Sequence, residues 1–148
     1  MHMLRAFVFS LAGIVACLVA AAPAVAADRV TGDDALEIRT VIQRQIEAFR
    51  RDDAQGAFAL LAPSVRQAFH TPQKFLEAVR MAYRAVYRPA SVVFLDMLVM
   101  GGDVVQPVQL TDRSGLVWTA YYSMQRQQDG SWRAAGCHLT QAVRSYPA

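Results

Sequence analysis

Three side chains could together perform acid–base chemistry: Asp96, Tyr121 and Tyr122. Asp96 stands in the middle of an otherwise apolar run, and a carboxylate shielded from water there would have a pKa raised toward that of a general base. A tyrosine hydroxyl could then stabilise the negative charge that develops on a substrate. These residues favour an isomerase- or hydratase-type reaction. The simpler interpretation is that Asp96 points outward and pairs with Arg126 or Arg133.

Cys137 and His138 could serve a metal site or a nucleophilic cysteine. Neighbours on a strand point to opposite faces, so these two cannot bind one ion together. His70 is the other histidine of the mature chain, and the carboxylates show no spacing that completes a zinc site. We therefore expect no metal and no other cofactor. A lone cysteine on a strand is usually a small buried hydrophobe, and we expect that role for Cys137.

Several aromatic and polar side chains could line a pocket for a small apolar or amphiphilic ligand. They are Tyr83, Tyr87, Arg88, Trp118, Tyr122, Trp132 and His138. In such a pocket Arg88, held in place by Pro89, would contact an anionic group. The same aromatic rings could instead fill a core between helices and sheet, with their hydroxyls at the rim. Both interpretations stay open at this point.

The elements that position these residues follow from periodicity, which is helical up to Pro89 and strand-like from Ser91 onward. Caps and prolines predict three helices. The first begins at Asp34 with Glu37 completing a capping box, the second lies between Asp53 and Pro63, and the third runs from Thr71 to Arg88. A further turn is expected over residues 65–70.

Four strands are expected over residues 92–100, 104–110, 116–127 and 132–143. The first is apolar on both faces, which predicts that both are covered. Pro107 places the second strand at an edge or at a bulge. Gly136 marks a bulge or a close helix contact, and Asp129-Gly130 predicts a tight hairpin. Helices followed by an antiparallel meander predict one α+β domain, with three N-terminal helices packed on a curved four-stranded antiparallel sheet.

Two runs of residues carry a family resemblance: Ile42-x-x-Gln45-x-x-Ala48-Phe49-x-x-Asp52-Asp53, and Asp129-Gly130-Ser131-Trp132-Arg133-x-x-Gly136-Cys137-x-Leu139. With the residues between them, over 36–139, they resemble a bacterial secreted family of unknown function. The resemblance implies export and the cystatin-like cone that nuclear transport factor 2-like and ketosteroid isomerase-like proteins share. It implies no activity and no functional residue. Ketosteroid isomerase-like enzymes also pair a strand carboxylate with a hydroxyl donor, but their catalytic motif does not match this chain residue by residue.

The first 26 residues are typical of a secretory signal peptide: a basic start, an apolar run over residues 6–22 and a small-residue ending. Cleavage between Ala26 and Ala27 would leave residues 27–148 as one exported domain, periplasmic or secreted, without a stable membrane anchor. Two alternatives use the same segment. The run of about 17 residues lies at the lower limit for a membrane span, and Cys17 could be acylated in a lipoprotein.

Composition narrows the class of partner. The chain has 15 Lys and Arg against 12 Asp and Glu, a net charge of +3, with the basic residues scattered along it. This pattern argues against nucleic-acid binding. Removal of the leader would leave Cys137 as the single cysteine, so no intramolecular disulfide is expected.

We predict a non-enzymatic binding domain for a small apolar or amphiphilic ligand, or for a protein partner at the exposed sheet face. One alternative is an enzyme that uses Asp96 as its base. The other is a structural homodimer in which sheet packs on sheet.

Overall fold

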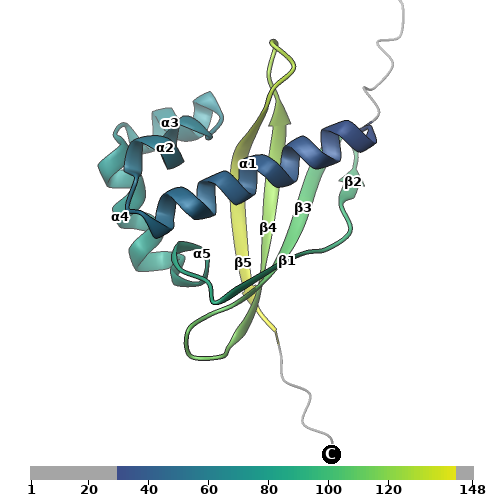
Figure 1. The fold of residues 1–148 in the computed structure, drawn as a ribbon. Helices are drawn as coiled ribbons and strands as arrows, with labels where there is room; N and C mark the ends of the chain where they lie inside the picture. Colours follow the sequence, from purple (N-terminus) through teal and green to yellow (C-terminus); the bar gives the residue numbers. More distant parts are fainter. Residues whose placement is uncertain (1–29, 143–148) are drawn as a thin grey trace, which may run out of the picture.

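The computed structural model of the protein describes residues 30–142, which form an α+β fold as predicted (Figure 1). The expected leader, its cleavage site at Ala26 and Ala27, and Cys17 lie outside the described residues. Five helices come first in the described part: α1 (Gly32–Arg50), α2 (Ala54–Ala59), α3 (Pro63–Phe69), α4 (Pro72–Ala82) and α5 (Arg84–Tyr87). Five strands follow: β1 (Ser91–Phe94), β2 (Leu98–Met100), β3 (Asp103–Thr111), β4 (Val117–Arg126) and β5 (Trp132–Gln141).

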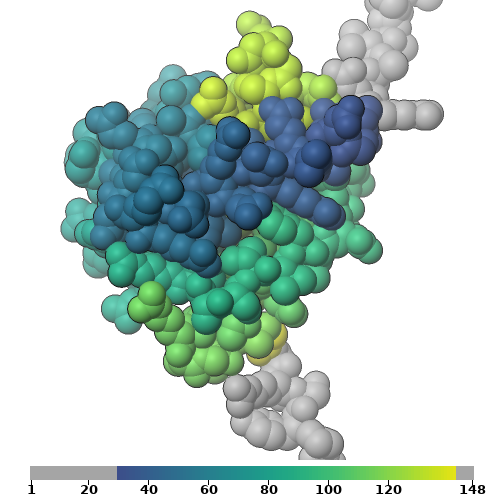
Figure 2. Space-filling model, viewed as in Figure 1, coloured from purple at the N-terminus to yellow at the C-terminus, as the bar shows by residue number. Residues whose placement is uncertain are grey.

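The long helix α1 crosses one face of the sheet, and the four short helices gather at its C-terminal end (Figure 1). Figure 2 shows α1 closing this side of the molecule, with the tip of the β4–β5 hairpin projecting above it. The sheet is antiparallel, in the order β1-β3-β4-β5, and β2 also pairs with β3. We call the face under α1 the inner face and the opposite one the outer face.

Helix α1 begins two residues before its predicted start. Its N-cap is Thr31, whose Oγ1 accepts a hydrogen bond from the backbone N–H of Asp34 at 3.2 Å, while the Asp34 carboxylate accepts from Thr31 N–H at 2.8 Å. Asp34 is therefore the third residue of the helix and the reciprocal partner in the capping box, a place that the sequence pattern assigned to Glu37. The prediction was wrong because Thr31 is equally able to cap and lies three residues before an acceptor.

Two of the predicted caps are confirmed. Asp53 Oδ1 accepts from Gly56 N–H at 2.9 Å at the start of α2, and Thr71 Oγ1 accepts from Lys74 N–H at 3.2 Å at the start of α4. The expected turn over residues 65–70 is a helix, α3, which Pro63 starts. The third predicted helix is divided at Tyr83, whose φ of −127° is not helical, so residues 30–142 contain five helices rather than three.

The predicted strand over residues 92–100 is broken in two because of Pro107 on β3. Leu95 N–H donates to Pro107 O at 3.0 Å, and a regular antiparallel ladder would return a hydrogen bond from residue 107 to Leu95 O. Proline has no N–H to give, and the Gln106 side chain donates to Leu95 O at 2.7 Å instead. Pairing resumes one residue out of step, since Phe94 faces Val108 but Leu98 faces Val105.

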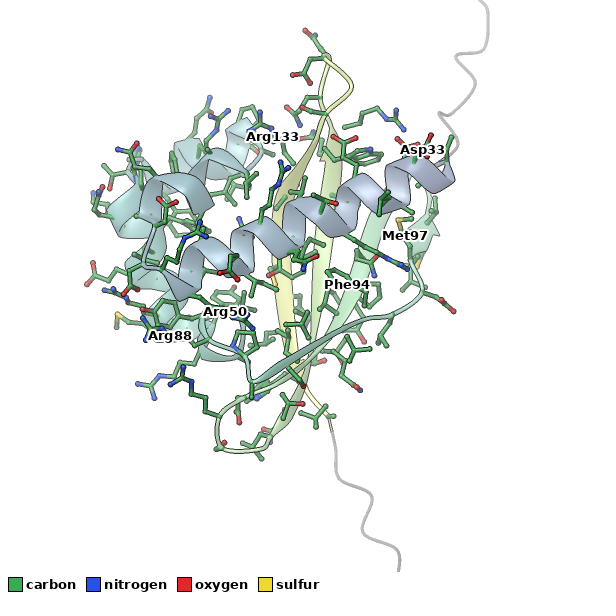
Figure 3. The ribbon with its side chains drawn as sticks, viewed as in Figure 1. Asp33, Arg50, Arg88, Phe94, Met97 and Arg133 are labelled. Carbon is green, nitrogen blue, oxygen red and sulfur yellow. The ribbon has the colours of Figure 1, made fainter. Side chains whose placement is uncertain are left out.

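The irregularity that Pro107 predicts is thus confirmed, but it lies on the neighbouring strand, between β1 and β2. The alternative, that the strand of Pro107 is an edge, is wrong, because β3 is paired on both sides. The expectation that residues 92–100 are covered on both faces is wrong. They form the edge of the sheet, where Val93, Val99 and Met100 are 50%, 58% and 62% exposed. Figure 3 labels Phe94, the last residue of β1, and Met97, which lies in the break just before β2.

The two glycine predictions on the last hairpin are confirmed. Gly130 turns the chain between β4 and β5 with a φ of 85°, in the left-handed region that glycine enters without steric cost. In β5, Gly136 lies opposite Ser123 and Ala134 lies opposite Met124, so Ala135 is an extra residue in a β-bulge.

A double-mutant cycle tests whether the Gln106 side-chain amide replaces the backbone N–H that Pro107 lacks. We expect Gln106→Leu to destabilise the protein more when Pro107 is present than when Pro107→Ala supplies a backbone N–H for Leu95 O. The coupling between the two positions should be about 1 kcal/mol, the net value of one hydrogen bond. Urea unfolding of the four proteins measures it, and additive effects would show that the Gln106 amide does not replace the missing donor.

Candidate functional site

A cavity of about 260 Å³ lies between the helices and the inner face of the sheet. Its floor is made of buried side chains, and its mouth of side chains that remain partly exposed. The floor comprises Gln45, Phe49, Leu61, Phe75, Val79, Val86, Tyr122 and Ala134. The mouth comprises Val65, Phe69, Ala78, Tyr83, Ala135, Gly136 and Cys137.

Aromatic packing forms the helical wall of the cavity. The ring of Phe75 on α4 lies 5.8 Å from that of Phe49 and 5.2 Å from that of Phe69, centre to centre, and it also packs on Phe58 at 6.2 Å. These tilted and edge-on pairs join α1, α2, α3 and α4 around one ring. Phe75 therefore holds the short helices in the positions that leave the cavity open.

The bulge in β5 decides which side chains form the sheet wall. Ala134 and Cys137 are three residues apart, and on a regular strand that odd spacing would place them on opposite faces. The extra residue Ala135 restores the register, so that Ala134 lies opposite Met124 and Cys137 lies opposite Tyr122. Directly opposite residues share a face of the sheet. Both Ala134 and Cys137 consequently face the cavity.

The hydroxyl of Tyr122 is the most informative polar group of the cavity. The side chain is 1% exposed, and among the described residues its hydroxyl oxygen has no hydrogen-bond partner. Burial raises the pKa of Tyr122 well above its usual value. The group is therefore a neutral donor, and in the protein alone its hydrogen-bonding capacity is unused.

The remaining polar groups of the cavity are neutral as well. Burial raises the pKa of the Cys137 thiol to about 12, so the thiolate that would act as a nucleophile does not form near neutral pH. Gln45 is 3% exposed, and its Nε2 donates to the carbonyl of Ala57 at 3.2 Å. None of the lining residues identified within residues 30–142 carries a charge.

Residues 31–147 match the family model described as a domain of unknown function, DUF4864. The chain belongs to this family. No curated protein matches the chain. The resemblance to a family of unknown function is thereby confirmed for this DUF4864 domain, and the cavity has to be interpreted from its own chemistry.

No helix within residues 30–142 is both long and apolar enough to cross a membrane. In the same residues, no group of three or more His, Cys, Asp and Glu side chains is arranged to hold a metal ion.

Of the residues that the sequence nominated for a pocket, Tyr83 and Tyr122 line the cavity. Tyr87 and Arg88 belong to a different, exposed cluster around Asp52. Tyr87 Oη donates to Asp52, and Arg80 and Arg88 pair with the same carboxylate at 2.9 and 3.1 Å. The hydrogen bonds from Tyr87 and then Arg80 lower the pKa of Asp52. The charge of Arg88 is thus matched outside the cavity, in the corner where Figure 3 labels it near Arg50.

Trp118 and Trp132 lie at opposite ends of the β4–β5 pair, and the indole N–H of each donates to a carboxylate. Trp118 Nε1 donates to Asp112 at 2.9 Å, and hydrogen bonds from Ser114 and then Trp118 lower the pKa of Asp112 to about 2. Trp132 Nε1 donates to Asp34 at 3.1 Å. Neither indole is among the residues found to line the cavity in the described part of the chain.

Tyr121 and His138 face away from the cavity. They lie directly opposite each other on β4 and β5, next to the inner-face pair Tyr122 and Cys137, and therefore point to the outer face. The prediction of a shielded Asp96 carboxylate is wrong. Asp96 is exposed in the break between β1 and β2, because that segment is the edge of the sheet.

The ion pair predicted for an outward Asp96 is not formed either. Arg126 pairs with Asp34 at 2.8 Å, and the Arg133 guanidinium donates to the carbonyl of Ala59. Each arginine thus has a partner on the helical side of the molecule. Within residues 30–142, the structure does not bring Asp96 together with either of the tyrosines proposed to assist it.

One lining residue, Gln45, could have been identified from the sequence but was not among the predicted pocket residues. Ile38, Ile42 and Phe49 form a buried stripe on α1, and the helical period places Gln45 within that stripe. An amide at a core position needs a partner or a function. The lining residues on α3 and α4 had no such signal, since their apolar side chains are also what a plain core requires.

The Asp34 carboxylate, which anchors α1 above the cavity, gives a pH prediction. Hydrogen bonds from the Thr31 backbone and from Trp132 hold its pKa well below the usual value. A lowered folded-state pKa contributes stability above the unfolded-state value of about 4, and this contribution is lost as the pH falls. We expect Asp34→Asn to melt below the wild type at pH 7, with the difference shrinking below about pH 4.

Thermal unfolding followed by circular dichroism between these pH values measures the effect. Asp33→Asn is the matched control, since it removes a carboxylate from the adjacent, exposed position. An equal effect of both substitutions would show that general helix charge, rather than the contacts of Asp34, is responsible.

Proposed function

We propose that this DUF4864 protein is an exported, non-enzymatic binding domain that holds a small apolar or amphiphilic ligand in the cavity between its helices and sheet. The observation that carries the proposal is a predominantly apolar cavity of about 260 Å³ with an unused tyrosine hydroxyl in its floor. Ligand sites in proteins are concave, mostly apolar and equipped with a few polar groups. The mouth formed by Tyr83 and the bulge of β5 provides access.

Binding is favoured over catalysis by the chemistry of the lining groups. General acid–base catalysis needs a group that exchanges its proton near the working pH. Burial raises the pKa of both Tyr122 and Cys137, and no carboxylate or histidine is among the lining residues found within residues 30–142. The isomerase or hydratase alternative would require Asp96 beside Tyr122, and Asp96 is exposed at the sheet edge.

The compartment and the fold family are part of the same proposal. The leader, with cleavage between Ala26 and Ala27, would deliver the domain to the periplasm or the exterior, and acylation of Cys17 is the alternative that keeps it at a membrane. Helices that enclose a cavity against an antiparallel sheet agree with a cystatin-like or nuclear transport factor 2-like cone. Folds of this kind serve many functions, so the function follows from the residues that line the cavity rather than from the fold.

Blocking the mouth of the cavity tests the proposal. Ala78 on α4 is a partly exposed lining residue, so the larger side chain of Ala78→Leu can extend into the opening of the cavity. With isopropylbenzene as a neutral apolar probe, we expect shifts of the backbone amide signals of Tyr83 and Cys137 in ¹H–¹⁵N NMR spectra. Ala78→Leu should weaken this binding at least about tenfold, a loss of about 1.4 kcal/mol.

Ala82→Leu is the matched control, because Ala82 lies exposed on the same helix and is not one of the lining residues identified. It should bind the probe as the wild type does. The proposal fails if the probe does not perturb the cavity residues, or if both variants bind it equally well.

A second candidate function is a homodimer through the outer face, and the exposed apolar side chains of β1 and β2 favour it. Val93, Leu95, Leu98 and Met100 share this face by their register with β3. Val93, Leu95 and Leu98 lie opposite the uncharged residues Gln109, Pro107 and Val105 of β3, whereas Met100 lies opposite Asp103. Two copies could therefore pack along most of this edge without like-charge repulsion. The occupant would be a second copy in antiparallel, isologous contact.

We expect sedimentation velocity to show a dimer that Leu98→Lys converts to a monomer. Leu36→Lys is the control, since Leu36 is 67% exposed on α1 and lies on a different element. A wild-type monomer at every concentration up to the solubility limit would refute the dimer.

A further inference from the structure

We infer that the ligand of the cavity is a neutral, compact molecule with a hydrogen-bond acceptor, such as a carbonyl group on a single-ring apolar body, and that the Tyr122 hydroxyl selects it. This inference rests on the proposed binding function and adds the chemical class. It follows from the hydroxyl, the lack of lining charge and the size of the cavity.

The hydroxyl requires an acceptor. Tyr122 is 1% exposed, and among residues 30–142 its hydroxyl oxygen has no partner. A buried donor that stays unpaired is costly, whereas a ligand acceptor placed before it recovers the lost hydrogen bond. Cys137 lies directly opposite Tyr122 on β5 and shares its face of the sheet, so its thiol adds a second, weaker donor to the same wall of the cavity.

A water molecule is a poor substitute for such a ligand at this position. A buried water is held by two to four polar partners. Beside the hydroxyl and the thiol, the floor offers Gln45, whose Nε2 is engaged with the carbonyl of Ala57 and whose Oε1 can accept. The surrounding floor side chains are apolar, including Phe49 and Val86. A water would leave these apolar side chains without contact, whereas an acceptor on an otherwise apolar molecule also packs against them.

Charge excludes carboxylates and other anions from the class. An ion moved into an apolar site without a partner is strongly disfavoured. No cationic side chain is among the lining residues found in the described part of the chain. Arg80 and Arg88, which flank the lining residues Tyr83 and Val86 in the sequence, are paired with Asp52. A neutral acceptor, such as a ketone, aldehyde, ester or amide oxygen, is what remains.

The volume sets the size of the body. A dry cavity of about 150 Å³ lined by Leu, Ile and Phe accommodates benzene. The cavity here measures about 260 Å³ and is walled by Phe49, Phe69 and Phe75. It therefore has room for one ring together with a short polar substituent, and the phenyl rings of the wall provide the apolar contacts.

Three probes with the same number of non-hydrogen atoms separate the contributions: acetophenone carries a neutral acceptor, isopropylbenzene carries none, and benzoate is an anion. Titrations followed by NMR give the dissociation constants for the wild type, Tyr122→Phe and the control Tyr121→Phe, which removes a hydroxyl from the outer face of the same strand. We expect the wild type to bind acetophenone more tightly than isopropylbenzene, and benzoate most weakly. Tyr122→Phe should weaken acetophenone binding about tenfold, which is about 1.4 kcal/mol, and leave isopropylbenzene unchanged. Tyr121→Phe should change neither.

The unliganded variant gives an independent readout. Since the hydroxyl has no internal partner, Tyr122→Phe should melt at the wild-type temperature or above it. A clear loss of stability would mean that the hydroxyl is satisfied inside the protein, and would overturn the inference. Equal binding of acetophenone by wild type and Tyr122→Phe, or tighter binding of benzoate, would overturn it as well while leaving the proposed function intact. If isopropylbenzene does not bind either, the proposed function itself fails.

Discussion

The carboxylate of Asp34 connects the helical half of the molecule to the sheet. It accepts hydrogen bonds from the N–H of Thr31 at 2.8 Å and from Trp132 Nε1 at 3.1 Å, and it pairs with Arg126 at 2.8 Å. The Arg126 guanidinium in turn lies 4.8 Å from the centre of the Trp132 ring. One side chain thus caps α1 and attaches its first turn to the β4–β5 hairpin, next to the turn of that hairpin. The path of α1 across the inner face, and with it the position of the lining residues Gln45 and Phe49, depends on this attachment.

Two departures from regular β structure shape what the sheet offers on its two sides. The bulge at Ala135 turns both Ala134 and Cys137 toward the cavity, which a regular strand could not do. Pro107 breaks the neighbouring strand and leaves an exposed apolar edge at β1 and β2. The inner face therefore borders a cavity, and the outer face carries exposed apolar side chains at its edge. Gln106 supplies the hydrogen bond that Pro107 cannot, so the break is stabilised by an adjacent residue.

Much of the local structure could be predicted, because its causes lie within a few residues. The caps at Asp53 and Thr71, the hairpin at Gly130 and the bulge beside Gly136 each follow from a short pattern with one physical explanation. The prediction failed where two patterns competed. Thr31 and Asp34 both resemble helix caps, and only one can occupy that position. For the site, Tyr83 and Tyr122 were identified among a larger set of aromatic residues, but their separation from the others required the packed structure.

By itself, the sequence determined the fold class and the order of the elements, since propensity, capping and periodicity act over short distances. The tertiary structure decided which polar groups are used. Arg88 pairs with Asp52, thirty-six positions away along the chain, and the indole N–H of Trp132 donates to Asp34 from the other end of the domain. Tyr122 acquires no such partner among the described residues. Whether a polar side chain is satisfied depends on residues that only folding brings within hydrogen-bond distance, and for this reason the site emerged from the structure.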